Sequence, residues 1–292
     1  MTLALVTVLY RSEAAVQSLW ASLQAQAYTD WRLIAVDNGG SDGAGAFLAA
    51  QGDGRVSLQM NVQNEGFARG ANAGLRLAVG AGAERCVLIN PDVRFGTEFL
   101  GELDAAWADQ DVVAPRVMQD GTADGVWYAG GTFEREWAFT NMHQTDLASP
   151  SRDVEFASGC CLGLTRAVLD RVGLLDESFF VYWEDADFCM RLAAAGVPIS
   201  YVREPCLWHE GGASSGGLPG GGEHGAGANR MYYEAYTVFL RKHFGLGYAV
   251  KTMARLVAKE LERHGRERAA HLGLAMAKGL AAPIRAVPRL NS

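Results

Sequence analysis

The fold is decided by residues 3–37, which read LALVTVLYRSEAAVQSLWASLQAQAYTDWRLIAVD. Two short apolar runs, residues 3–9 and 32–36, are typical of buried strands, and residues 13–26 between them have the spacing of an amphipathic helix. A strand, a helix and a second strand in this order form a βαβ unit with parallel strands. The opening of the chain therefore predicts an α/β protein.

The same alternation continues along the chain. Further helices or strands are expected at residues 44–50, 56–60, 70–81, 86–89, 99–109, 112–117, 166–172, 182–195 and 199–202. We therefore expect a mostly parallel central sheet flanked by helices on both faces. Residues 120–153 have no clear period and are interpreted as hairpins or loops beside a site.

The bulk composition describes a protein with a sizeable core and no nucleic-acid partner. The chain has 292 residues, 49% of them hydrophobic, and a net charge of −7, whereas nucleic-acid binding requires a basic surface. Five cysteines without a CxxC spacing indicate neither a disulfide framework nor a zinc site, and favour the cytoplasm. No run reaches the roughly 18–20 apolar residues of a membrane span, and the first ten residues are interpreted as a strand instead of a signal peptide.

The C-terminal end differs from the rest in charge. Residues 250–292 contain nine Lys or Arg and three Asp or Glu. Residues 251–261 have apolar side chains at helical spacing with basic ones between them, which is typical of a helix on a membrane surface. A helix packed on the body of the protein, or in a homodimer, is the alternative. We treat residues 246–292 as a basic helical extension of a body formed by residues 1–245.

Polar residues collect at the predicted carboxyl ends of the strands, where open α/β sheets bind their ligands. They include Tyr10, Asp37, Asn38, Asn90 and Asp92. Asp and Asn are also common turn formers, which is the alternative for each position. The turn after the first strand has no glycine and no GxxxxGK[ST] motif occurs, so dinucleotide-binding and P-loop folds are excluded. A phosphorylated ligand here would then need a divalent cation, and Asp92 is the carboxylate placed to hold it.

Seven ordered motifs resemble the family 2 glycosyltransferases, most closely the bacterial rhamnosyltransferase-like branch. They are VTVLY (6–10), VDNGGSDG (36–43), NEGFARGAN (64–72), LINPDV (88–93), ASGCC (157–161), DESFF (176–180) and WEDADFCMR (183–191). The resemblance implies a GT-A fold over residues 1–245, with a nucleotide-sugar-binding half (1–115) and an acceptor-binding half (116–245). It also implies an enzyme that inverts the anomeric centre.

The resemblance also implies roles for residues that contact the donor and its metal. The implied donor-binding residues are Tyr10, Asp37, Asn38, Arg69, Asn72, Asn90 and Asp92. Asn90 and Asp92 match the family's DxD motif, with Asn90 in place of the first acid, so Asp92 is left as its only carboxylate ligand. His209 matches a family histidine that reaches the metal, and an imidazole ligand favours Mn²⁺ over Mg²⁺. Arg69 lies in a segment that is equally interpreted as a helix cap.

The acidic cluster at 184–187 supplies the expected catalytic base. Asp185 matches the family's catalytic acid and is expected to take the proton of the acceptor hydroxyl. Trp183, Glu184 and Trp208 are the candidate acceptor-binding residues, because aromatic faces stack on sugars, although core packing explains either tryptophan equally well. Arg191 either pairs with this cluster or approaches the diphosphate. The glycine-rich loop 211–227 is interpreted as a lid that closes over the donor, with an inert linker as the alternative.

These expectations combine into one hypothesis. The chain is expected to move a sugar, L-rhamnose from dTDP-rhamnose above all, to a cell-surface glycan or lipid-linked glycan acceptor. It would use Mn²⁺ or Mg²⁺ and work in the cytoplasm or at the cytoplasmic membrane face. A UDP-sugar donor (galactose, glucose or N-acetylhexosamine) is the alternative within the family. A nucleotidyltransferase, or a carbohydrate-binding relative that has lost catalysis, is the alternative outside it.

Overall fold

The computed structural model of the chain describes residues 2–40, 43–107, 110–121, 125–134, 139–143, 151–210 and 226–291. Most of the glycine-rich segment 211–227 lies outside these residues, and so does the lid that the sequence suggests there.

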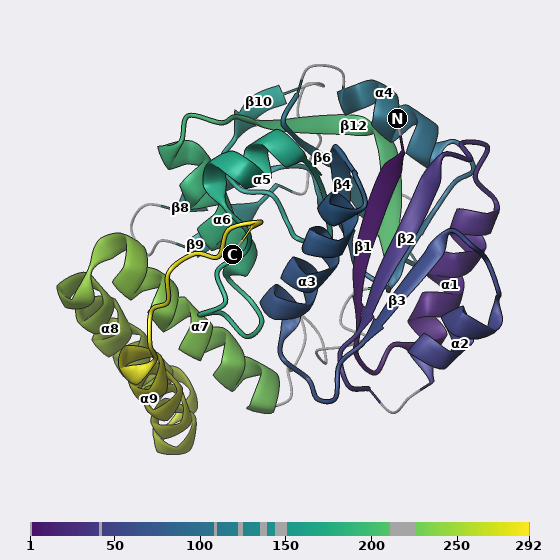
Figure 1. Ribbon diagram of the computed structural model, residues 1–292. Coiled ribbons are helices and arrows are strands. Elements are labelled where there is room, and N and C mark those ends of the chain that lie inside the picture. Colours follow the sequence, from purple (N-terminus) through teal and green to yellow (C-terminus); the bar gives the residue numbers. More distant parts are fainter. Residues whose placement is uncertain are drawn as a thin grey trace.

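The N-terminal half is a parallel sheet covered on both faces. Its strands follow the spatial order β4-β1-β2-β3, and every neighbouring pair is parallel. Helix α3 packs against β1, β2 and β4, while α1 and α2 lie on the other side of the strands (Figure 1). These elements are β1 (Leu3–Leu9), α1 (Glu13–Gln24), β2 (Trp31–Asp37), α2 (Ala44–Ala50), β3 (Val56–Met60), α3 (Phe67–Gly80) and β4 (Arg85–Ile89). The predicted α/β alternation is confirmed.

Burial and close packing explain this layer. All seven residues of β1 are buried, as expected for a central strand covered on both faces. Helix α3 approaches β1 through Gly70 and Gly74, since a Cβ atom at Gly70 would lie 2.9 Å from Cγ1 of Val8 and one at Gly74 would overlap Val6. The two glycines therefore bring the start of α3 against the carboxyl end of β1, where the site forms.

The second half makes the sheet mixed. Strand β11 is antiparallel to both of its neighbours, β4 and β6, whereas β12 is parallel to β6. The sheet thus continues as β10-β12-β6-β11-β4, with β5 paired to β12 and β7 to β6. The expectation of a mostly parallel sheet holds for the first half alone. The strands here are β5 (Val93–Phe95), β6 (Val112–Gln119), β7 (Val126–Tyr128), β10 (Ser151–Val154), β11 (Cys161–Thr165) and β12 (Ile199–His209).

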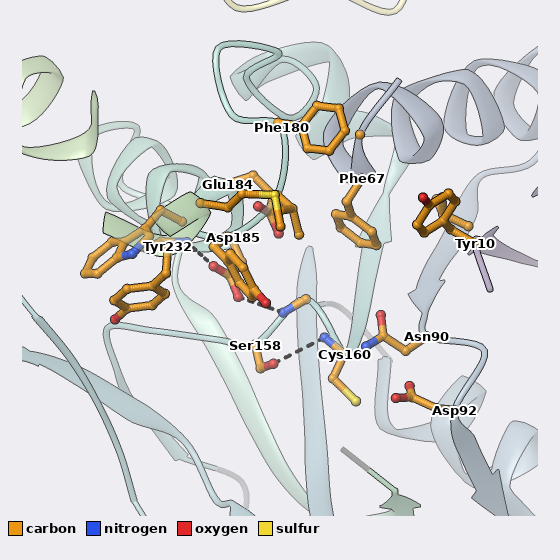
Figure 2. Close-up of a pocket in the computed structure, with 18 of the residues that line it drawn as sticks. Tyr10, Phe67, Asn90, Asp92, Ser158, Cys160, Phe180, Glu184, Asp185 and Tyr232 are labelled. Atoms are coloured by element: carbon orange, nitrogen blue, oxygen red, sulfur yellow. Dashed lines mark hydrogen bonds between the residues drawn. The ribbon is translucent and has the colours of Figure 1, made fainter. Parts of the chain in front are cut away.

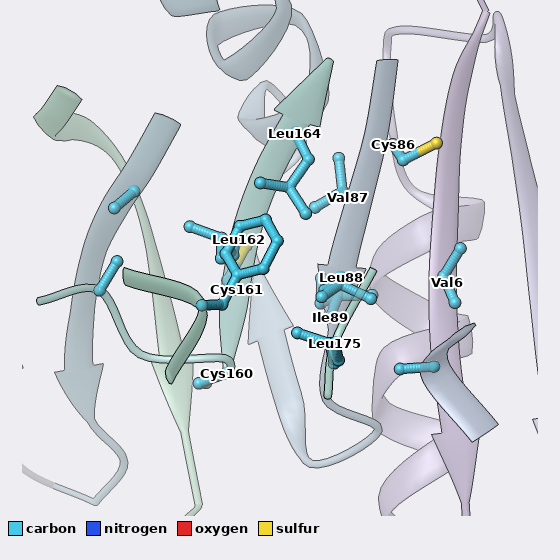
Figure 3. Close-up of a cluster of buried hydrophobic side chains, with 14 of the residues drawn as sticks. Val6, Cys86, Val87, Leu88, Ile89, Cys160, Cys161, Leu162, Leu164 and Leu175 are labelled. Carbon is cyan, nitrogen blue, oxygen red and sulfur yellow. The ribbon is translucent and has the colours of Figure 1, made fainter. Parts of the chain in front are cut away.

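The two halves share one core. Apolar side chains of the paired strands β4 and β11 belong to the same buried cluster, as Figure 3 shows for Val87, Leu88, Leu162 and Leu164. All five cysteines are free thiols, and Cys86, Cys160, Cys161 and Cys189 are buried in this interior. Residues 120–153 contain β7 and a separate hairpin of β8 (Gly131–Glu134) and β9 (Phe139–Met142), in agreement with the interpretation of this stretch.

Six helices complete the described chain, and the last two of them, α8 and α9, pack on α7. They are α4 (Phe99–Trp107), α5 (Arg166–Val172), α6 (Glu184–Ala194), α7 (Ala226–Phe244), α8 (Leu246–His264) and α9 (Arg266–Ala281). After α9 the chain turns back onto the body: Leu174 N–H donates to the carbonyl of Pro288 at 2.9 Å, and Arg285 N–H donates to Oγ of Ser178 at 2.7 Å. No helix of the described residues is both long and apolar enough to cross a bilayer.

Candidate active site

A cavity of about 330 Å³ opens at the carboxyl ends of the parallel strands, between the two halves of the sheet. In Figure 2, Asn90 and Asp92 lie on one side of it and Glu184, Asp185 and Tyr232 on the other. Most of the predicted site residues line this cavity: Tyr10, Asn38, Asn90, Asp92, Trp183, Glu184, Asp185 and His209. The structure therefore brings together side chains that the sequence separates by up to two hundred residues.

Asp92 and His209 meet because of a strand that the sequence patterns did not reveal. The three-residue strand β5 begins directly after Asp92 and pairs with β12 so that Val93 lies opposite His209. The N–H of Glu210 also donates to the carbonyl of Asp92 at 3.0 Å. Register in this short pairing thus fixes His209 beside Asp92.

The geometry of this pair fits a divalent cation. Nε2 of His209 lies 3.1 Å from Oδ1 of Asp92, and both side chains are buried. The pair lacks hydrogen-bond geometry: Oδ1 and both imidazole nitrogens have no hydrogen-bond partner among the described residues. Two neighbouring ligands of an octahedral cation at roughly 2.1 Å lie about 3 Å apart, which matches the observed spacing. The described residues contain no cluster of three or more His, Cys, Asp or Glu ligands, so water and substrate phosphates would have to complete the shell.

Asp185 enters the cavity from the first turn of α6. Its Oδ2 accepts the N–H of Gly159 at 3.1 Å and its Oδ1 accepts the N–H of Ala186 at 2.8 Å. Burial raises the pKa of Asp185, and these backbone donors oppose the rise by stabilising the carboxylate. Tyr182 and Trp183, immediately before the helix, have left-handed backbones with φ of 69° and 68°. Asp185 is thus a half-buried carboxylate that lines the cavity and is held by two backbone N–H groups.

Glu184 lines the same cavity but is held differently. The residue is 6% exposed, and its Oε2 has no hydrogen-bond partner among the described residues. Burial, together with the neighbouring charge of Asp185, raises the pKa of Glu184 to about 8. The two adjacent carboxyl groups therefore have different environments. Asp185 accepts two backbone N–H groups, whereas Glu184 has an unpaired oxygen.

Asp187, two residues after Asp185 on α6, belongs to an ion cluster and does not line the cavity. Although burial raises its pKa, the hydrogen bond from His243 and the charges of Arg191 and Lys242 hold the pKa of Asp187 at about 2. Lys242 Nζ lies 2.6 Å from Asp187 and 2.5 Å from Oδ2 of Asp176, so it joins α6 to the start of the loop that leads into it. Arg191 binds Asp187 at 2.8 Å. The sequence left two positions open for Arg191, beside the acidic cluster or near the diphosphate, and in the structure it lies beside the acidic cluster.

Three predicted donor-binding residues do not line the cavity. Asn72 is fully buried and binds the backbone of Leu175, while Arg69 pairs with Glu177 at 3.5 Å. The carboxylate of Asp37 accepts the N–H of Gly40 at 3.2 Å. Through Asn72 and Arg69, α3 is connected to the loop before α6. Asp37 shapes the turn after β2.

Asn38 lines the cavity, yet its side-chain amide is already fully used. Its Nδ2 donates to Oδ1 of Asn64 and to the carbonyl of Gly66, and its Oδ1 accepts from Asn61 and from the N–H of Glu65. An amide group has two donors and two acceptor sites. Asn38 therefore organises the 61–66 loop that borders the cavity, and its own side chain has no spare group for a donor.

The two candidate tryptophans have different surroundings. Trp183 is 4% exposed and packs against Tyr236 and Phe239 at ring-centroid distances of 4.6 and 4.9 Å, so it is a wall of the cavity that is anchored in the core. Trp208 precedes His209 in β12 and points to the opposite face of the strand, where Arg94 covers it at 4.9 Å. Trp208 does not line the cavity, and the expected stacking on an acceptor sugar does not fit this position.

Several aromatic residues of the cavity were missed by the sequence patterns. Trp127 on β7 lies 4.8 Å from the His209 ring, and Phe67, Phe180 and Tyr232 also line the cavity. Trp127 lies in the non-periodic segment 120–153, and Phe67 and Phe180 lie inside the quoted motifs without a distinguishing spacing. The only signal was the number of aromatic residues in these segments.

Comparison with known proteins identifies the family of the chain. Residues 4–173 match the family described as Glycosyl transferase family 2. The chain belongs to this family. The family resemblance predicted from the motifs is thereby confirmed.

The chain is similar in sequence to three glycosyl-transferring enzymes. The chain is 28% identical over 242 residues to the N-acetylglucosaminyl-diphospho-decaprenol L-rhamnosyltransferase of Mycobacterium tuberculosis, with 74% of this chain and 78% of that protein covered. It is 24% identical to the dTDP-rhamnosyl transferase RfbF of Shigella flexneri and 23% identical to the low-salt glycan biosynthesis hexosyltransferase Agl10 of Haloferax volcanii. The match with RfbF covers 64% of this chain and 62% of RfbF. The match with Agl10 covers 68% of this chain and 63% of Agl10.

Solved structures share the fold. The structure of GalNAc-T7 with UDP, GalNAc and Mn²⁺ superposes with a TM-score of 0.65 at 14% identity, covering 97% of this chain and 58% of that one. Similarity at this level of identity establishes the fold alone. The protein has the GT-A fold that the motifs implied.

Proposed function

We propose that the protein is an inverting glycosyltransferase that moves a sugar from a nucleotide-sugar donor to a hydroxyl group of a glycan acceptor. The observation that carries this proposal is the content of one cavity: the unsatisfied pair Asp92 and His209 on one side and the half-buried carboxylate of Asp185 on the other. A cation held by that pair would stabilise the negative charge of the departing diphosphate.

The remaining chemistry belongs to the residues of the chain. Asp185 takes the proton of the acceptor hydroxyl while that oxygen forms a bond to the anomeric carbon, and the bond from this carbon to the diphosphate oxygen breaks. The backbone donors from Gly159 and Ala186 hold the carboxylate in place for this step. Tyr10 and Asn90, which line the cavity near Asp92, are the residues we assign to the donor. Asp37, Arg69 and Asn72 would contact it only after a change in their present bonds.

For the donor we propose dTDP-L-rhamnose. The support is the printed function of two relatives, a dTDP-rhamnosyl transferase and an L-rhamnosyltransferase. A UDP-sugar is the alternative, supported by the UDP and GalNAc in the GalNAc-T7 structure, which also contains Mn²⁺. The acceptor that we propose is a lipid-linked glycan, because the mycobacterial relative is named for a diphospho-decaprenol substrate.

A membrane position is consistent with the outer face of α8. Leu246, Val250 and Leu261 are 61%, 47% and 47% exposed there. Next to this apolar stripe run exposed basic residues at four-residue spacing, Lys251, Arg255, Lys259 and Arg263. A helix with adjacent apolar and basic stripes binds anionic lipid surfaces. We therefore propose peripheral contact with the cytoplasmic membrane face through α8.

The test is release of nucleoside diphosphate from a panel of dTDP-, UDP- and GDP-sugars with Mn²⁺ and glycan acceptors. The proposal expects transfer from one donor class, and expects Asp185→Asn to lower kcat by roughly 10²- to 10⁴-fold with donor binding retained. Asp170→Asn, a surface carboxylate on α5, is the matched control. The absence of release from every donor would contradict the proposal, and loss of donor binding in Asp185→Asn would remove this residue from the role of base.

A further inference from the structure

The first turn of α6 presents two carboxyl groups to the cavity, and the proposed reaction uses only one of them. Asp185 is the assigned base, while Glu184 has no role in proton transfer. Glu184 is more than nine-tenths buried, lines the cavity, and has Oε2 without a hydrogen-bond partner among the described residues. A buried polar atom that faces an open cavity and has no partner in the protein is placed to meet a ligand.

The charges around Glu184 come from two helices. On α6 its neighbours are the carboxyl groups of Asp185 and Asp187, which both disfavour a second negative charge. On α7 the side chains of Lys242 and His243 bind Asp187 instead, and no ion pair of Glu184 occurs among the described residues. Tyr232 of α7 also lines the cavity, and burial raises its pKa, so it stays neutral.

This setting separates the protonation states of the two neighbours. Burial raises the pKa of both groups, but Asp185 receives two backbone N–H groups, which stabilise its carboxylate. Glu184 has an unpaired Oε2 and the like charge of Asp185 beside it, which favour the neutral acid. A neutral carboxylic acid has an O–H donor, which a carboxylate lacks. Pairs of carboxyl groups with opposed environments take opposed acid and base roles in enzymes.

We propose that Glu184 works as a neutral acid whose O–H donates a hydrogen bond to an oxygen of the acceptor sugar and so holds the attacking hydroxyl in front of Asp185. This inference rests on the proposed glycosyl transfer and adds to it a residue that fixes the acceptor through its protonated form. It requires Glu184 to stay protonated at neutral pH, which agrees with the raised pKa of about 8. Ionisation above that pH removes the donor and places a second negative charge beside the base.

The experiment compares Glu184→Gln with Glu184→Ala over pH 6 to 10, measuring kcat and the KM for the acceptor. Glutamine keeps a neutral donor but does not titrate, and alanine removes the donor. We expect kcat/KM for the acceptor to fall on the order of 10- to 100-fold in Glu184→Ala. This substitution leaves the acceptor oxygen without its hydrogen-bond donor, and the loss of one partner of a buried hydrogen bond has about this effect. Glu184→Gln is expected to recover most of this loss. The wild-type enzyme is expected to lose activity above about pH 8, and the glutamine variant is expected to lack that decline.

A second measurement tests the protonation state without activity. The infrared C=O band of a buried carboxylic acid should be present in the wild-type protein at pH 7, absent from Glu184→Gln, and lost from the wild type above about pH 8. No band that depends on Glu184, or equal impairment of the glutamine and alanine variants, would overturn the inference. A wild-type protein with the band but without transfer from any donor would contradict the proposed function alone.

Discussion

His209 Nε2 lies 3.1 Å from Asp92 Oδ1 inside the protein, and the two atoms face each other without hydrogen-bond geometry. A buried imidazole and carboxylate normally satisfy each other, because an unpaired buried polar atom costs about 1–3 kcal/mol. Asp92 directly precedes β5 and His209 ends β12, and these two strands pair, so the spacing of the two residues is set by the sheet. An unsatisfied pair at this spacing is what a metal site requires of its protein ligands.

Metal binding should depend on both members of the pair. We expect Asp92→Asn and His209→Ala each to weaken Mn²⁺ binding at least 10-fold. The described residues contain no group of three or more possible ligands, so each substitution would remove one of the two side chains that we assign to the cation. Electron paramagnetic resonance of free Mn²⁺ measures this directly, and chelation followed by Mn²⁺ addition should abolish and restore transfer. The control is His264→Ala, an exposed histidine at the end of α8. Unchanged Mn²⁺ affinity in both site variants would contradict the assignment.

The ion pairs of Lys242 with Asp176 and Asp187 should position the first turn of α6, which contains Asp185. Lys242→Met leaves the buried carboxylates of Asp176 and Asp187 without their shared cation, which is expected to cost about 3–5 kcal/mol of unfolding free energy. If Lys242 also orients α6, kcat should fall in the fraction that remains folded while the KM for the donor changes little, and Lys242→Arg should restore part of kcat. Denaturant unfolding and steady-state kinetics measure the two effects. Loss of stability with unaltered kcat would limit Lys242 to a structural role.

Glu184 should make the protein less stable as the pH rises. Its pKa is raised from 4.5 to about 8 in the folded protein, so the folded state binds the proton more tightly than the unfolded chain. This contribution is complete below about pH 4.5 and is lost as the pH approaches and passes 8. We therefore expect Glu184→Gln to raise the Tm relative to the wild type at pH 8.5 by more than at pH 5. Glu210→Gln, at an exposed position, is the control, and equal Tm differences at both pH values would contradict the prediction.

Vesicle binding should depend on the basic stripe of α8. The triple substitution Lys251→Glu, Arg255→Glu and Lys259→Glu is expected to abolish cosedimentation with anionic vesicles, since each basic residue contributes about 1 kcal/mol near such a surface. Vesicles of neutral phosphatidylcholine should bind neither protein. Arg32→Glu, an exposed basic residue of β2, is the control for charge alone. Equal binding of wild type and triple variant would remove the membrane proposal, and a wild-type dimer that the triple substitution dissociates would assign this face to a second copy.

Local patterns predicted most of the first half of the fold. The predicted bounds are correct for β1, β3 and α2, and also for α5 in the second half. Each of these is a short segment whose pattern of apolar residues shows where it begins and ends. Helix α3 begins three residues before its predicted start, since Phe67 is held at the helix entrance by a hydrogen bond to the Phe180 carbonyl. Strand β5 and the extension of β12 to His209 were not predicted, because they depend on pairing between distant segments. The mixed second half of the sheet follows from the same kind of pairing.

The sequence by itself determined the α/β alternation, the family, and the placement of Tyr10, Asn90 and Asp92 at one edge of the sheet, because the carboxyl ends of parallel strands converge whatever surrounds them. Only the tertiary structure decided which polar side chains face the cavity. Asn38 and Asn72 are of the same type as Asn90, yet contacts across the fold consume their amides. Strand register turned His209 toward Asp92 and Trp208 away from it. Lys242 and His243 of α7 bind Asp187 on α6, whereas Glu184 keeps an unpaired oxygen. These outcomes depend on partners far away in sequence, which no local pattern specifies.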